Sequence, residues 1–199
     1  MTLNLIGSGG HATVVADVAR RAGHQEIIIW ADAPPDLGRF PPGTRYRAQA
    51  ELSPTVPVLL AVGALDQRRS LRRGFPCAPP ALLDPSAAIG HGVFVGDGTV
   101  VFAACVVNAN ARVGSDAILN TGCIVEHDCV VGANCHLSPG VRLAGAVEIG
   151  DDVHVGLGAV VLPGIRVGHR VTIGAGAVVT RNVNPGLTIV GIPAKPLSR

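Results

Sequence analysis

A six-residue period runs without interruption through the second half of the chain. Stepping by six from Ile89 reaches Val, Ile or Leu at sixteen consecutive positions, ending at Val179. An α-helix does not explain this period, because six residues turn a helix by about 240°. The repeated aliphatic side chains would then not lie on one face of the helix. A strand that turns a corner every six residues does explain it. The period therefore predicts a parallel β-helix of about five coils, each with three sides and roughly 18 residues.

The residues beside the repeated aliphatic position support this interpretation. The next residue is usually Gly and sometimes Asn, which suits a turn. The residue two positions earlier is small, and four of the five cysteines occupy it: Cys105, Cys123, Cys129 and Cys135. We expect these thiols to fill a narrow core rather than bind zinc or carry an acyl group.

Composition disfavours several classes of protein. A net charge of +2 and an aromatic content of 3% give little basis for binding nucleic acid, and an apolar content of 48% excludes disorder. No apolar stretch approaches the roughly 20 residues of a membrane span. The amino terminus lacks the pattern of a signal peptide, so a cytoplasmic protein is expected. An odd number of cysteines, five, argues against a disulfide framework in such a protein.

Residues 1–80 lack the six-residue repeat and predict a separate α/β domain. Residues 81–199 then form the β-helix and a carboxy-terminal tail. The expected unit is a small Rossmann-like βαβαβ fold with a parallel sheet. In chain order its elements are strand 3–6, a helix to about residue 21, strand 27–30, strand 58–62 and helix 66–73.

The turn after the first expected strand has the spacing Gly7-x-Gly9-x-x-Ala12, a loose form of the dinucleotide fingerprint. Asp32 follows the second strand, near the place of an acid that binds ribose. A nucleotide phosphate or ribose is favoured over NAD, because about 80 residues provide only one mononucleotide-binding half. Two plainer interpretations stay open: the glycines only permit a tight turn, and His11 only begins a helix.

Glu126-His127-Asp128 departs from the repeat at a corner where simpler turn residues would suffice. Histidine titrates near neutral pH, as a general base for acetyl transfer to an amine or hydroxyl must. A carboxylate on the other ring nitrogen would fix the tautomer and raise the basicity of the ring. The residues alone leave both Asp128 and Glu126 as candidates for that carboxylate.

Six segments carry a wider resemblance: GSGGHA, NTGCIVEHDCVVG, HLSPGVRLAG, VGLGAVVLPGIRVG, IGAGAVVTRNV and VGIPAK. Together they resemble the bacterial sialic-acid O-acetyltransferase and nucleotide-amino-sugar N-acetyltransferase family, whose hexapeptide repeats form a left-handed β-helix. The resemblance implies a homotrimer with active sites between subunits. It also implies acetyl-CoA as co-substrate, no metal, and a UDP- or GDP-linked amino sugar of surface-glycan biosynthesis as acceptor.

The resemblance further implies roles for individual residues. His127 would be the base and Asp128 its partner. His136 and Gly145 would line the acetyl thioester, with the Gly145 N–H polarising its carbonyl. Asn120 would face the acceptor amine.

Two more groups of residues follow from the resemblance. The pantetheine arm would run along Leu157, Gly174 and Ala175, and the nucleotide sugar would be held by Gly9, Gly10, His11, Asp32 and Arg68. The chain departs from the family at residues 63–65, Gly-Ala-Leu, where polar residues commonly follow the glycine. That departure puts contacts from this loop in question.

Other functions remain alternatives. O-acetylation of sialic acid or another sugar hydroxyl would use the same histidine, whereas a trimeric scaffold would bind no CoA. A dinucleotide-dependent oxidoreductase is disfavoured by the half-sized domain. His154 lies one expected coil above His136, and we assign it no function. A metal site there is disfavoured, because two histidines without further ligands hold a metal poorly.

Overall fold

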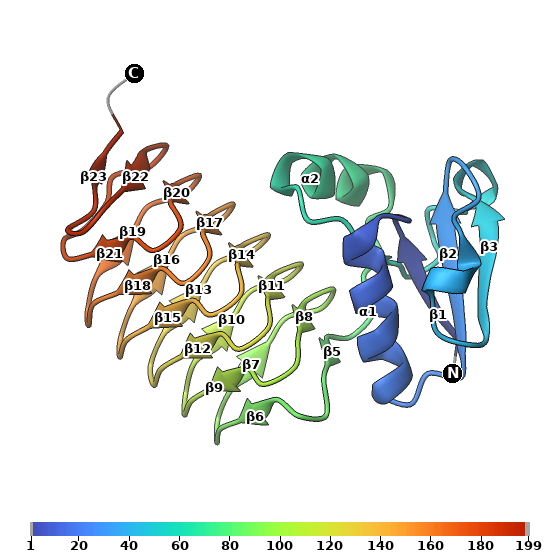
Figure 1. The fold of residues 1–199 in the computed structure, drawn as a ribbon, viewed down its shortest axis with the longest axis horizontal. Helices are drawn as coiled ribbons and strands as arrows, with labels where there is room; N and C mark the ends of the chain where they lie inside the picture. The colour runs from blue at the N-terminus through green and yellow to red at the C-terminus, as the bar shows by residue number, and fades with distance from the viewer. Residues whose placement is uncertain (1, 198–199) are drawn as a thin grey trace.

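The computed structural model describes residues 2–197, which form an α/β domain followed by a parallel β-helix (Figure 1). Across these residues no helix has both the length and the apolar character needed to cross a membrane.

The α/β domain is built on a four-stranded parallel sheet of order β3-β2-β1-β4. Its strands are β1 (Thr2–Ile6), β2 (Glu26–Ala31), β3 (Thr44–Ala48) and β4 (Leu59–Leu60). Its helices are α1 (Gly10–Arg21), α2 (Leu65–Gly74) and the short 3₁₀ turns Leu37–Arg39 and Gln49–Glu51.

The sheet differs from the predicted βαβαβ unit by one strand. Strand β3 was not expected, and only a 3₁₀ turn lies between β2 and β3. Arg45 and Arg47 of β3 are exposed, while Thr44 and Tyr46 are half-buried. An edge strand of this composition lacks the apolar run by which the other strands were recognised.

The β-helix has three parallel faces, which we name by order along the chain. The first face holds β5 (Leu82–Leu83), β8 (Val100–Val101), β11 (Ile118–Leu119), β14 (His136–Leu137), β17 (His154–Val155), β20 (Thr172–Ile173) and β22 (Thr188–Val190), with β23 (Lys195–Pro196) antiparallel to β22. The second face holds β6 (Ala88–Ile89), β9 (Val106–Val107), β12 (Ile124–Val125), β15 (Arg142–Leu143), β18 (Val160–Val161) and β21 (Val178–Val179). The third face holds β7 (Phe94–Val95), β10 (Arg112–Val113), β13 (Val130–Val131), β16 (Glu148–Ile149) and β19 (Arg166–Val167).

Each coil advances by the predicted 18 residues, because Ile118 pairs with Val100 on one side and with His136 on the other. This triangular coil fits the left-handed winding that the resemblance implies. We name the corners by the faces they join: the first corner joins the first and second faces, the second corner joins the second and third, and the third corner joins the third and first.

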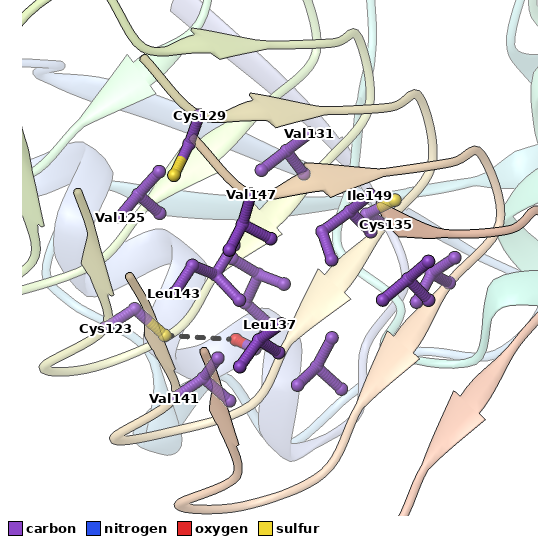
Figure 2. Close-up of a cluster of buried hydrophobic side chains, with 14 of the residues drawn as sticks. Cys123, Val125, Cys129, Val131, Cys135, Leu137, Val141, Leu143, Val147 and Ile149 are labelled. Atoms are coloured by element: carbon purple, nitrogen blue, oxygen red, sulfur yellow. Dashed lines mark hydrogen bonds between the residues drawn. The ribbon is translucent and has the colours of Figure 1, made fainter. Parts of the chain in front are cut away.

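The repeated aliphatic side chains form the core of the β-helix (Figure 2). They are buried at every step from Val101 to Val179, whereas Ile89 is 38% exposed in the first coil, which has no coil beneath it. Cys105, Cys123, Cys129 and Cys135 are all fully buried. The prediction that these cysteines are core residues is therefore confirmed.

The turns differ from the predicted arrangement. Backbone φ is positive three residues after the aliphatic position, as at Asp116 (55°) and Asp128 (60°), and not at the glycine that directly follows it. That glycine serves another purpose, since a Cβ added at Gly114 would lie 2.7 Å from the Ala133 backbone nitrogen of the next coil. Close approach between coils, rather than a left-handed turn, accounts for glycine there.

The α/β domain packs against the first coils of the first face. Helix α1 shares a hydrophobic cluster with Val100 and Ile118, and Figure 1 shows it between the sheet and the β-helix. Two ion pairs also join the domains, both from α2 to the third corner of the β-helix. Arg72 binds Asp116 at 2.6 Å and Arg69 binds Asp152 at 2.9 Å. The α/β domain does not cover the later strands of this face, β20 and β22, where Thr172 and Thr188 are exposed (Figure 1).

Candidate active site

His127 lies at the second corner, between β12 and β13, with an exposed imidazole. Its Nδ1 is 2.8 Å from Asp128 Oδ2, and Asp128 Oδ1 accepts a hydrogen bond from Asn110 Nδ2 at 3.2 Å. The hydrogen bond from His127, and then that from Asn110, lower the pKa of the Asp128 carboxyl. An ionised Asp128 keeps a proton on Nδ1, so Nε2 is left with the lone pair that a general base requires.

Asp128, rather than Glu126, makes contact with the ring. Glu126 instead accepts a hydrogen bond from Asn108 Nδ2, at 2.8 Å, in the coil below. The sequence placed both acids beside the histidine but did not show their directions. The two acids differ in backbone conformation, because Asp128 has a positive φ of 60° and Glu126 does not.

Gly145 lies one coil above His127 and contacts its ring. A Cβ added at Gly145 would lie 2.7 Å from both Cε1 and Nε2 of His127. Within residues 2–197 the Gly145 N–H donates no hydrogen bond, while the next N–H, from Ala146, donates to the His127 carbonyl at 2.9 Å. A free N–H on the residue beside the His127 ring suits stabilisation of an oxyanion.

Within one chain His136 lies apart from Gly145, so a thioester lined by both, as the resemblance implies, would need residues from two subunits. His136 projects from β14 on the first face, against the α/β domain. Its Nδ1 is 3.2 Å from the Gly63 carbonyl oxygen and its Nε2 is 3.3 Å from Asn120 Nδ2. Burial lowers the pKa of His136 to about 4, so the ring is neutral at pH 7.

The three residues expected along the pantetheine arm lie at the first corner, in coils above Asn120. Leu157 is 60% exposed, and Ala175 is exposed as well. Gly174 packs against Val190, because an added Cβ would lie 2.7 Å from Val190 Cγ1. Within one chain the second face separates these residues from the corner that holds His127.

A cavity of about 580 Å³ lies beside the start of α1, and Gly9, Gly10, His11 and Asp32 all line it. Gly9 caps α1 without a side-chain hydrogen bond, and the first turn, residues 10–13, holds no acidic side chain. The positive end of the helix is therefore free to meet a phosphate.

Gln49 and Gln67 also line this cavity, and the sequence did not point to them. Gln49 follows the unexpected strand β3, and Gln67 lies in the first turn of α2. Neither belongs to a recognisable motif, so only the fold brings them to the site.

His11 is neutral in this structure. Burial, and then the nearby charge of Arg68, lower the pKa of His11 to about 4. Its Nε2 is buried without a hydrogen-bond partner among the described residues, and its ring centroid is 6.2 Å from that of His136. A buried ring nitrogen without a partner is less costly as a lone pair than as an N–H, which favours a proton on Nδ1.

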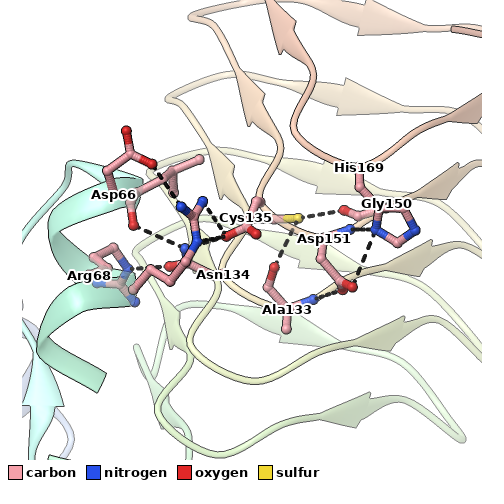
Figure 3. A network of polar contacts seen from close by, with 11 residues as sticks. Asp66, Arg68, Ala133, Asn134, Cys135, Gly150, Asp151 and His169 are labelled. Carbon is pink, nitrogen blue, oxygen red and sulfur yellow. Dashed lines mark hydrogen bonds and ion pairs between the residues drawn. The ribbon is translucent and has the colours of Figure 1, made fainter. Parts of the chain in front are cut away.

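Arg68 does not line the cavity beside the start of α1. It is fully buried, and its guanidinium donates to the carbonyls of Leu60 (2.5 Å), Val62 (2.9 Å) and Asp116 (2.5 Å). Figure 3 shows it beside Asn134, whose Oδ1 accepts from Arg68 Nε at 3.3 Å. The expectation that Arg68 holds the nucleotide sugar is corrected by this burial: the side chain joins the two domains.

His154 lies above His136, with ring centroids 5.3 Å apart. Its Nε2 is 3.1 Å from Ser138 Oγ, and burial lowers its pKa. It lines a second cavity of about 420 Å³, which shares Gly63 with the cavity beside the start of α1. Among residues 2–197 no cluster of His, Cys, Asp and Glu is arranged to hold a metal ion.

Comparison with known families covers both domains. The PglD N-terminal domain matches residues 2–74, and the bacterial transferase hexapeptide (six repeats) family matches residues 110–145 and 146–181. No curated protein sequence matches the chain significantly.

Solved structures resemble the chain along its whole length. The acetyltransferase domain of PglB from Neisseria gonorrhoeae FA1090 is 35% identical with a TM-score of 0.89, covering 98% of this chain and 99% of its own. The same domain in complex with acetyl-CoA is 34% identical, with a TM-score of 0.89 and 98% coverage of both chains. PerB from Caulobacter crescentus, in complex with CoA and GDP-perosamine, is 33% identical with a TM-score of 0.87, covering 100% of this chain and 98% of its own.

Proposed function

Because the chain belongs to the hexapeptide-repeat acetyltransferases that carry a PglD-type amino-terminal domain, we propose that it transfers the acetyl group of acetyl-CoA to the amine of a nucleotide-linked amino sugar. The observation that carries this proposal is the His127–Asp128 pair in contact with Gly145. The likeness to a structure that contains GDP-perosamine and CoA supports the class of acceptor.

The proposed reaction is a direct transfer. The acceptor amine attacks the thioester carbonyl, and His127 Nε2 takes the proton that the nitrogen gives up. The Gly145 N–H stabilises the oxyanion, and the C–S bond then breaks to release CoA thiolate, which accepts a proton from the imidazolium. A general base of this kind typically contributes about 10²–10⁴-fold in rate, and one oxyanion donor about 3–4 kcal/mol.

We assign the nucleotide to residues 1–80, in the cavity lined by Gly9, Gly10, His11 and Asp32. Residues 81–199 would carry the chemistry. Backbone N–H groups at the start of α1 would bind phosphate, and Asp32 would accept from ribose hydroxyls. Gln49 and Gln67 add amide groups that suit hydrogen bonding to a nucleobase or sugar.

We further propose a homotrimer in which each active site lies between two subunits. His127 and Gly145 would come from the second corner of one subunit. Asn120, Leu157 and Ala175 would come from the first corner of its neighbour. A site that needs residues from both corners is incomplete in one chain, because the second face stands between them.

Subunit mixing tests this arrangement. His127→Ala and Asn120→Ala proteins should each be nearly inactive, and unfolding and refolding them together should restore activity in about a quarter of the sites. Mixed samples as inactive as either parent would contradict a shared site.

The reaction itself is tested with a panel of UDP- and GDP-linked amino sugars and acetyl-CoA, following release of the CoA thiol. We expect release that depends on one class of amino sugar and yields an amide. Matched sugars with a hydroxyl in place of the amine are the control. Turnover of the hydroxyl sugars alone would establish the O-acetyltransferase alternative instead.

Removing all five cysteines should leave kcat for acetyl transfer nearly unchanged, because direct transfer uses no thiol. Burial raises the pKa of Cys135 to about 12 and also raises that of Cys129, so these thiols stay protonated. The measurement is steady-state kinetics of a variant with Ala at the buried positions and Ser at Cys77. An acetyl-cysteine trapped in the native enzyme by mass spectrometry would contradict direct transfer.

Gly145→Ala should lower kcat by about 10²-fold without unfolding the protein. The new methyl group would lie 2.7 Å from two atoms of the His127 ring and must displace it, and an error of about 1 Å in a catalytic group costs roughly that much. Gly140→Ala is not a suitable control because its φ is 71°. Gly10→Ala is structurally tolerable but lines the nucleotide cavity, so it should change KM for the sugar rather than kcat.

A further inference from the structure

A continuous chain of hydrogen bonds runs from the α/β domain to the first corner of the β-helix. The Gly63 carbonyl oxygen is 3.2 Å from His136 Nδ1, and His136 Nε2 is 3.3 Å from Asn120 Nδ2. Asn120 Oδ1 is 2.8 Å from the backbone nitrogen of Thr121. Both nitrogens of the His136 ring are thus occupied by protein groups.

The two ends of this chain determine where every proton lies. The Gly63 carbonyl can only accept, so His136 Nδ1 must carry a proton. The Thr121 N–H can only donate, so the oxygen of the Asn120 amide faces Thr121 and its NH₂ group faces His136. The NH₂ group donates to Nε2, which therefore holds a lone pair.

The surroundings of His136 keep its ring in this neutral form. The ring is half-buried under the α/β domain, its centroid is 5.3 Å from that of His154 and 6.2 Å from that of His11, and the buried Arg68 adds a positive charge nearby. A second proton would place an N–H of His136 against the NH₂ group of Asn120. Protonation would therefore break the chain at its middle.

We propose that His136 is a positioning residue, which sets the direction of the Asn120 amide from the loop that holds Gly63. The proposal rests on the proposed function and adds a role within the subunit to the thioester contact that the resemblance implies for His136. One hydrogen of the Asn120 NH₂ group is used by His136, and the other is left to meet the acceptor sugar.

The same loop also borders the cavity assigned above to the nucleotide. Gly63 lines both the nucleotide cavity and the second cavity. A nucleotide sugar bound against this loop would hold the Gly63 carbonyl in place. Through His136 it would also hold the Asn120 amide at the first corner. Correct placement of the acceptor is thereby tied to occupation of the nucleotide cavity.

Nitrogen-15 NMR of the histidine side chains tests the proton positions without any need for activity. The expected His136 signals, assigned by their loss in His136→Phe, are those of a neutral ring protonated on Nδ1, unchanged from pH 8 down to about pH 5. A ring protonated on Nε2, or charged at pH 7, would overturn the proposal. The result stands whether or not the proposed acetyl transfer is found.

Kinetics of a double-mutant cycle tests the action through Asn120. His136→Phe should lower kcat by about 10–100-fold and leave the acidic limb of the pH–rate profile in place, since the base is elsewhere. In Asn120→Ala protein the same substitution should cost nothing more. His154→Phe, one coil above, is the matched control and should cost the same in the wild-type and in the Asn120→Ala background.

If the fold-losses in kcat from Asn120→Ala and His136→Phe multiply in the double mutant, His136 acts independently of Asn120. The proposal would then be wrong. If the wild-type enzyme acetylates no nucleotide amino sugar, the proposed function fails instead. In that event the tautomer seen by NMR alone decides the role of His136.

Discussion

His127→Ala is expected to lower kcat by about 10²–10⁴-fold while the Kd for acetyl-CoA changes little. The base acts on the acceptor amine, and its removal leaves the backbone N–H of Gly145 and the exposed first corner as they are. Steady-state kinetics with the preferred amino sugar gives kcat, and calorimetry gives the Kd.

The chain offers a matched control for this substitution. His169 is a second exposed histidine beside an aspartate, at the third corner (Figure 3). Its side chain is 61% exposed, close to the 62% of His127. Its Nδ1, however, accepts the backbone N–H of Asp151 at 2.8 Å, so it cannot also carry a proton there.

His169→Ala should therefore leave kcat near the wild-type value. The two histidines share a repeat position, similar exposure and an acidic neighbour, and they differ in tautomer and in the glycine that touches the ring. Equal losses in the two variants, or none in His127→Ala, would remove His127 from the mechanism.

The β-helix could be predicted from the sequence because its period is a property of neighbouring residues. Every coil has aliphatic residues that point inward at six-residue intervals, with a small residue two positions earlier that is cysteine in four places. Strand β3 has no such pattern, since Arg45 and Arg47 project into solvent and, within residues 2–197, it pairs with β2 alone.

The candidate site was predictable where its residues are adjacent in sequence. Glu126, His127 and Asp128 stand out against the repeat, but their directions depend on a left-handed backbone that no residue type fixes. The contact of His136 with Gly63 joins positions 73 residues apart, and only the packing of the two domains produces it.

Arg68 shows the same limit most clearly. In the sequence it is one of four arginines in α2, and only the resemblance distinguished it from Arg69, Arg72 and Arg73, with a role at the nucleotide sugar. In the structure it is the member of the set that is fully buried. A side chain that the resemblance assigned to the nucleotide sugar instead donates to protein carbonyls.

Arg68→Met is expected to lower the free energy of unfolding by about 3–5 kcal/mol, and the Tm by roughly 10 °C. Methionine fills much of the same volume but donates no hydrogen bond. The carbonyls of Leu60, Val62 and Asp116 would each lose the buried donor that they now accept from. Leaving such groups unpaired costs about 1–3 kcal/mol apiece before the structure relaxes.

Burial disfavours the charged form of Arg68 and lowers its pKa to about 10. The guanidinium is nevertheless ionised at pH 7. Its retention therefore depends on those carbonyls, two from β4 and the loop after it and one from the β-helix. Arg73→Met, an exposed neighbour on α2, should change stability by less than about 0.5 kcal/mol. Urea unfolding of both variants measures the difference, and an Arg68→Met protein as stable as Arg73→Met would show that the two domains hold together without this arginine.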